Sequence, residues 1–116
     1  MYCMFMNSHF NSDISLWDVS KVKDMNGMFC NAVFNQNIGN WDVSKVITME
    51  TMFDESKFNK DISNWNVKKV KDMREMFANS EFNQDISKWK ISPICKMSNI
   101  FYNCPIKDEY VPGYNQ

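Results

Sequence analysis

A 24-residue repeat is the strongest constraint on how this sequence can fold. Tryptophan recurs at this interval, as do two phenylalanines and one isoleucine of each repeat. These columns are Trp17, Trp41, Trp65 and Trp89; Phe5, Phe29, Phe53, Phe77 and Phe101; Phe10, Phe34, Phe58 and Phe82; and Ile14, Ile38, Ile62 and Ile86. Because one unit of this length cannot bury its own apolar side chains, neighbouring repeats must stack on one another.

Two segments of each repeat have the hydrophobic pattern of regular secondary structure. The apolar residues within 25–32 are spaced i, i+3, i+4 and i+7, which predicts two turns of helix. Residues placed to act as N-caps precede this face at Asp24, Thr48 and Asp72. The segment 14–19 alternates Trp17 and Val19 with polar Asp18, which predicts a short β-strand.

We therefore predict an α/β solenoid, a right-handed stack of about four 24-residue coils, each with a short parallel β-strand and a short helix. The expected coils lie near residues 1–24, 25–48, 49–72 and 73–104, with 105–116 as a C-terminal tail or cap. A column of β-branched residues, Val22, Val46, Val70 and Ile94, recurs at the same interval. The last coil departs from the pattern at Lys90, Pro93, Cys95 and Lys96.

The repeating unit Asn-x-Asp-Ile-Ser-x-Trp-Asp-Val-Ser-x-Val-x-x-Met-x-x-Met-Phe resembles that of the BspA-like leucine-rich-repeat surface proteins, including their mycoplasma lipoprotein relatives. The resemblance runs from Met1 to about Cys104, and residues 59–77 match most of the unit. It implies a leucine-rich-repeat-like solenoid, a role in surface display, cell adhesion or protein–protein contact, and a cell-surface or extracellular location. It supplies no catalytic residues.

Charge and hydropathy limit the classes of partner that we expect for this chain. Thirteen basic and fourteen acidic residues give a formal net charge of −1, so no sequence-wide field draws the chain to nucleic acid or to an anionic membrane. No apolar run is long enough to span a bilayer, and the first residues do not resemble a signal peptide. We expect a protein partner or self-association, without nucleic acid or direct membrane insertion. A cytosolic or virion-internal location therefore stays open beside the cell surface.

Residues that would support catalysis or cofactor binding are sparse. The one histidine, His9, shares its column with Val33, Lys57 and Glu81, and a column that tolerates valine does not fit an active site. The glycines are scattered and the cysteines lack metal-ligand spacing. We therefore predict no enzymatic activity, no cofactor, no metal and free thiols.

The invariant polar column is expected to be structural. Its members are Asn11, Asn35, Asn59 and Asn83. A stacked asparagine in a bend usually bonds backbone groups, although with the acidic residues two positions later the column could instead offer calcium ligands. The structural reading is preferred because Asn37 replaces an aspartate in that second column.

The apolar columns are assigned to the core. The expected core residues are Trp17, Trp41, Trp65, Trp89, Phe29, Phe53, Phe77 and Phe101. An exposed tryptophan stripe or an adaptable methionine groove is the alternative, but stacked exposed indoles would form a large apolar patch.

Two surfaces are candidates for binding, and they define the predicted function. The first is a polar lane on the predicted strands, formed by Leu16, Asp18, Asn40, Asp42, Asn64, Asn66, Lys88 and Lys90. The second is the uncapped N-terminal edge, formed by Met1, Met4 and Phe5. We expect a non-enzymatic protein-interaction or adhesion-type module that uses either surface. The alternative is a structural component that stacks end to end or forms part of a larger particle.

Overall fold

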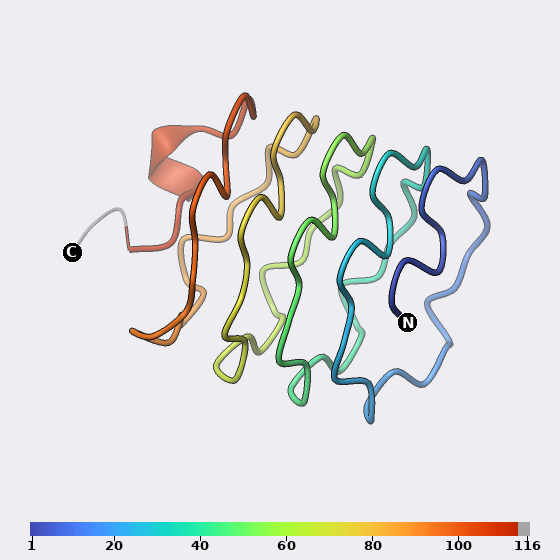
Figure 1. Cartoon of the computed structure of the whole chain (residues 1–116), viewed down its shortest axis with the longest axis horizontal. Helices are drawn as coiled ribbons and strands as arrows, with labels where there is room; N and C mark the ends of the chain where they lie inside the picture. Colours follow the sequence, from blue (N-terminus) through green and yellow to red (C-terminus); the bar gives the residue numbers. More distant parts are fainter. Residues whose placement is uncertain (114–116) are drawn as a thin grey trace.

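Successive 24-residue repeats lie side by side in a computed structural model, which describes residues 1–113. In Figure 1 the chain advances from the N-terminal repeat at the right to the C-terminal repeat at the left, each repeat forming one open loop beside the last. The molecule measures 37 × 29 × 21 Å, with a radius of gyration of 12.8 Å. Its core runs along the stack between the two sides of each loop.

The prediction of an α/β, leucine-rich-repeat-like fold is wrong. Residues 1–113 contain no α-helix and no β-strand. The single regular element among them is the short 3-10 helix η1, Asp108–Tyr110, near the C-terminus. Apart from it, the repeats consist of turns and of segments without regular structure, joined by isolated parallel bridges that link Asp24, Thr48, Asp72 and Lys96 in succession.

Two four-residue turns, each with a residue of positive φ, stand in each repeat where a helix was predicted. In the second repeat, Gly27 and Asn31 have φ angles of 64° and 52°. Each is the third residue of a four-residue turn, closed by Met28 N to Met25 O at 3.3 Å and by Ala32 N to Phe29 O at 3.2 Å. The same two positions have positive φ in every repeat, at Cys3, Asn7, Thr51, Glu55, Glu75, Asn79, Asn99 and Asn103. Four-residue turns bury the same apolar residues as a helix would, so hydrophobic spacing did not separate the two structures.

Part of the backbone hydrogen bonding of these turns is made with the next repeat. Alternate amides donate across the stack: Gly27 N to Glu50 O at 2.9 Å, Phe29 N to Met52 O at 2.9 Å and Asn31 N to Asp54 O at 2.7 Å. A helix would have used such amides within its own segment. The segment predicted as a helix is therefore the one that holds neighbouring repeats together.

The predicted strand is also a turn. Trp17 N donates to Ile14 O at 3.1 Å, and Ser15 N donates to the Asp13 carboxylate at 2.8 Å. Each later tryptophan reaches sideways, because its indole Nε1 donates to the isoleucine carbonyl of the preceding repeat: Trp41 to Ile14 at 3.1 Å, Trp65 to Ile38 at 3.0 Å and Trp89 to Ile62 at 3.0 Å. The amphipathic pattern thus reflects a buried indole with a satisfied N–H.

Aromatic rings form two continuous files in the core. Phe29, Phe53 and Phe77 stack with centroids 5.6 Å apart, and Phe34, Phe58 and Phe82 stack at 6.3 Å. Within a repeat, the two files touch at 4.2–4.4 Å. Each ring therefore contacts its own repeat and both neighbours, which couples the stability of adjacent repeats.

Candidate functional site

The invariant asparagines form a ladder along the stack. Asn11 Oδ1 accepts the backbone amide of Asn35 at 2.8 Å, and Asn35 and Asn59 do the same for the following asparagine at 2.9 and 2.8 Å. Asn83 Oδ1 ends the ladder on Lys107 N at 3.0 Å. Each side-chain oxygen is committed to a backbone donor, so this column fixes the register of the repeats.

Removing one rung of the ladder is expected to destabilise the fold. Asn59 Oδ1 accepts both Asn83 N at 2.8 Å and Gln84 Nε2 at 3.1 Å. Asn59→Ala leaves these donors without that acceptor, at a cost of about 1–3 kcal/mol in the free energy of unfolding. Urea denaturation measures the change. Asn59→Asp keeps the oxygen and should cost clearly less; equal losses in the two variants would mean that the ladder bond has no role.

The predicted polar lane is exposed, but it lies on turns. Leu16 is 93% exposed, and the other seven residues of the lane are exposed as well. Asp18, Asp42 and Asn66 each accept the backbone amide of the residue two positions later, at 3.0–3.1 Å. Since there is no strand in this segment, the polar strand face proposed from the sequence does not exist as such.

Local hydrogen bonds hold the acids of this lane in the charged form. The Ser20 hydroxyl, with the Ser20 amide, lowers the pKa of Asp18, and Ser44 lowers the pKa of Asp42 in the same way. These carboxylates serve first as acceptors that shape their own turns. Their oxygens are only partly available to a partner.

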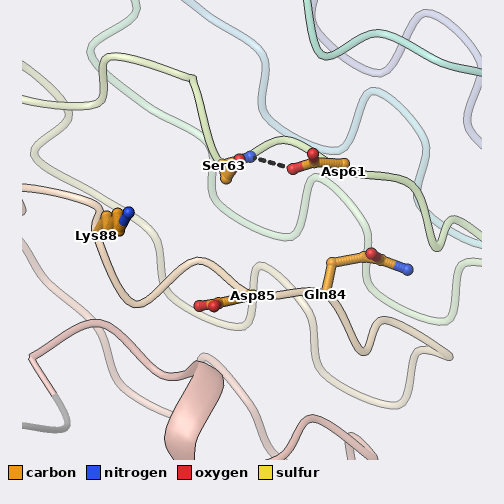
Figure 2. Close-up of a pocket in the computed structure, with 5 residues that line it drawn as sticks. All are labelled: Asp61, Ser63, Gln84, Asp85 and Lys88. Atoms are coloured by element: carbon orange, nitrogen blue, oxygen red, sulfur yellow. Dashed lines mark hydrogen bonds between the residues drawn. The ribbon is translucent and has the colours of Figure 1, made fainter.

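A small hollow opens between the third and fourth repeats (Figure 2). Its volume is about 210 Å³, and it is lined by Asp61, Ser63, Gln84, Asp85 and Lys88. Asp61 accepts the amide of Ser63 at 2.8 Å, as drawn, and Asp85 accepts the amide of Ser87 at 2.9 Å. Both acids therefore have the turn-forming role seen in the lane.

Candidate ligands for a metal do not converge within residues 1–113: no three or more histidine, cysteine, aspartate or glutamate side chains come together there. His9 is exposed, and Cys3, Cys30, Cys95 and Cys104 are free thiols. Burial, followed by the charges of Asp54 and Glu55, raises the pKa of Cys30 to about 11. A thiol that stays protonated at neutral pH is a poor nucleophile. No helix in the described part of the chain is long and apolar enough to cross a bilayer.

The predicted N-terminal edge exposes apolar columns that are buried elsewhere. Met4 is 51% exposed, whereas Met28, Met52 and Met76 in its column are fully buried. Trp17 is 37% exposed, against 3–5% for the other tryptophans. Met1 and Phe5 are half-buried against the core. Over half of the large exposed apolar residues among those described lie in this repeat, namely Tyr2, Met4, Met6, Leu16 and Trp17.

The C-terminal edge was not identified from the sequence. Met97 and Phe101 are only half-buried, and Tyr102 is 63% exposed. Ile106 and Lys107 continue the repeat register before η1, which lies on one part of this end (Figure 1). The repeat columns could have revealed this edge, because residues 97–107 follow them without a complete further coil.

Comparisons with known proteins give a family and no closer relative. A family model described as "Mycoplasma protein of unknown function, DUF285" matches residues 1–112. No curated protein and no solved structure matches the chain.

Proposed function

The chain belongs to the DUF285 family of mycoplasma proteins, and we propose that it is a non-enzymatic assembly module whose ends associate with a repeat stack of the same design. The partner in this proposal is a second copy of the chain, bound head to tail. The observation that carries the proposal is the complementarity of hydrogen-bonding groups at the two ends.

The backbone at the two ends offers matching groups. Near the C-terminal end of the stack, Glu75, Phe77 and Asn79 donate their amides to Ser98 O, Ile100 O and Tyr102 O at 3.0, 2.9 and 2.8 Å. One repeat further along, the donors would be the amides of Asn99, Phe101 and Asn103, which make no hydrogen bond within residues 1–113. The carbonyls of Tyr2, Met4 and Met6 occupy the acceptor columns, and among the described residues they accept none.

The apolar side chains at the two ends also match each other. Phe101 and Phe5 terminate one aromatic file, which is spaced at 5.6–5.8 Å through the stack. Placing Phe5 of one copy after Phe101 of another continues this file and covers Met4 and Trp17. Burial of these apolar side chains would drive association, while the backbone groups would set its register.

The polar lane supports a partner less strongly. Several of its oxygens already accept turn amides, and no buried side-chain nitrogen or oxygen among the described residues lacks a hydrogen-bond partner. The likeness of the repeat to that of BspA-like surface proteins supports placing the assembled module in contacts at a cell surface, including adhesion. In this proposal the assembled stack presents the lane repeatedly, so that weak contacts can add.

Sedimentation equilibrium of the chain and of Met4→Lys tests the proposal. The average mass of the unmodified chain should rise with concentration above the 13.8 kDa of one copy. Met4→Lys places a charge in the apolar end contact, and association should weaken about tenfold or more. The monomer should still fold, because Met4 is 51% exposed there; its urea midpoint checks this.

Val33→Lys is the matched control, because Val33 is 37% exposed on the side of the second repeat. It introduces the same charge away from both ends and should associate as the unmodified chain does. A single 13.8 kDa species over the whole accessible concentration range would refute the proposal. Equal weakening by the two lysine substitutions would also refute end-to-end contact.

A further inference from the structure

The balanced net charge conceals a one-sided distribution of lysine. Segments 64–72 and 88–96, which cover the same repeat positions, contain six lysines and one acidic residue, Asp72, whose carboxylate is paired with Arg74. In the corresponding segments of the first two repeats, Asp18 and Asp42 accompany the lysines. The lysines concerned here are Lys68, Lys69, Lys71, Lys90 and Lys96, which we name the lysine edge; all are exposed.

The lysine edge is continuous and its charges are not neutralised by ion pairs within the described residues. Lys68 and Lys90, from neighbouring repeats, line one open hollow together with Ile91 and Pro93. Lys96 N donates to Lys71 O at 2.9 Å, so the backbones of these two residues are adjacent. In the ion pairs found within residues 1–113, the basic residues are Lys57 and Arg74. No lysine of the lysine edge belongs to one of them.

Pro93 places an apolar side chain among these lysines. In the second and third repeats the turn closes from Val46 N to Val43 O and from Val70 N to Val67 O, and both turn-closing valines are fully buried. A proline in the third position of such a turn is unfavourable, whereas the second position suits its fixed φ. In the fourth repeat the turn shifts by one residue and closes from Cys95 N to Ser92 O at 3.0 Å.

The shift takes Ile94 out of the buried position that Val46 and Val70 occupy in their repeats. Cys95 packs against the core, and Ile94 is 71% exposed at the turn. An isoleucine beside a proline, with lysines on the same edge, matches the chemistry of a membrane interface, where apolar groups enter the acyl boundary and cations face anionic headgroups.

We propose that the lysine edge docks on an anionic lipid bilayer, with Ile94 entering the interface and the lysines contacting lipid headgroups. A bilayer fits better than an acidic peptide because exposed Pro93 lines the same hollow as Lys68 and Lys90, and exposed Ile94 follows it in the turn. The expectation from net charge alone, that no anionic membrane attracts this chain, does not take account of this segregation. The inference is independent of end-to-end association.

Vesicle sedimentation tests the inference with the intact chain. Vesicles of equal parts phosphatidylserine and phosphatidylcholine should bind it at low salt, whereas pure phosphatidylcholine vesicles should bind it far less. Lys68→Gln with Lys90→Gln should reduce the partition coefficient about 25-fold, at about fivefold per lysine. Ile94→Ser should reduce it about tenfold.

Lys21→Gln with Lys45→Gln is the matched control. These lysines occupy turn positions of the first two repeats, beside Asp18 and Asp42, and their removal changes the net charge equally. This control should retain most of the binding, and both double variants leave the stack ends unchanged. Equal losses in the two double variants, or no binding to the anionic vesicles, would overturn the inference. Binding to polyglutamate without binding to vesicles would assign the edge to an acidic protein and would overturn it as well.

Discussion

Phe53→Ala is expected to lower the free energy of unfolding by about 3–5 kcal/mol, a large part of the stability of a domain of this size. Phe53 is fully buried at the centre of the stack. Its ring contacts Phe29 and Phe77 at 5.6 Å and Phe58 at 4.4 Å. Its removal leaves a cavity that the neighbouring repeats cannot fill without breaking their shared register. Urea denaturation followed by tryptophan fluorescence measures the loss.

Phe101→Ala provides the comparison, since this ring is at the end of the same file and is only half-buried. It contacts one ring of that file, Phe77, at 5.8 Å. We expect less than half of the loss seen for Phe53→Ala. Similar losses for the two variants would show that the central ring gains nothing from its position between two neighbours.

Trp65→Ala is expected to cost a similar amount, about 3–5 kcal/mol, for two separate reasons. The indole is 3% exposed and stacks on Trp89 at 6.4 Å. Its Nε1 also donates to Ile38 O at 3.0 Å, which ties the third repeat to the second. Trp65→Phe keeps much of the ring but removes this donor, so it should recover part of the loss.

Trp17 is the reference for this pair. It is 37% exposed, and its ring contacts Phe5 at 5.8 Å. Trp17→Ala should therefore cost much less than Trp65→Ala when the chain is kept dilute. If the two alanine variants unfold at the same urea concentration, the link between indole burial and repeat stacking is wrong.

Repeat spacing predicts more about this molecule than local secondary-structure patterns do. The columns at Trp41 and Phe53 mark side chains that are buried in the second, third and fourth repeats. The pattern within 25–32 predicted a helix. Apolar residues spaced i, i+3, i+4 and i+7 are buried equally well by a helix and by two successive four-residue turns. Thr51, Glu55 and Glu75 gave no warning, since these residues rarely adopt positive φ.

For the candidate surfaces too, the repeat columns predicted some features and not others. Exposure of Met4 follows from the repeat pattern, because its column is covered by a neighbour wherever one is present. The matching amides of Asn99 and Asn103 could not be inferred, since they depend on hydrogen bonds that run between repeats and not within them. The exposure of Ile94 could not be inferred from its column, because a column assumes equal turn positions and Pro93 moves the turn.

Amide hydrogen exchange at increasing protein concentration tests the proposed assembly most directly. Exchange at Asn99, Phe101 and Asn103 should slow as the chain associates, because these amides would then donate to the carbonyls of Tyr2, Met4 and Met6 in the next copy. In Met4→Lys the same amides should reach equal protection only at a concentration about tenfold higher or more. If they stay unprotected while the average mass rises, the copies associate through another surface and the end-to-end account is contradicted.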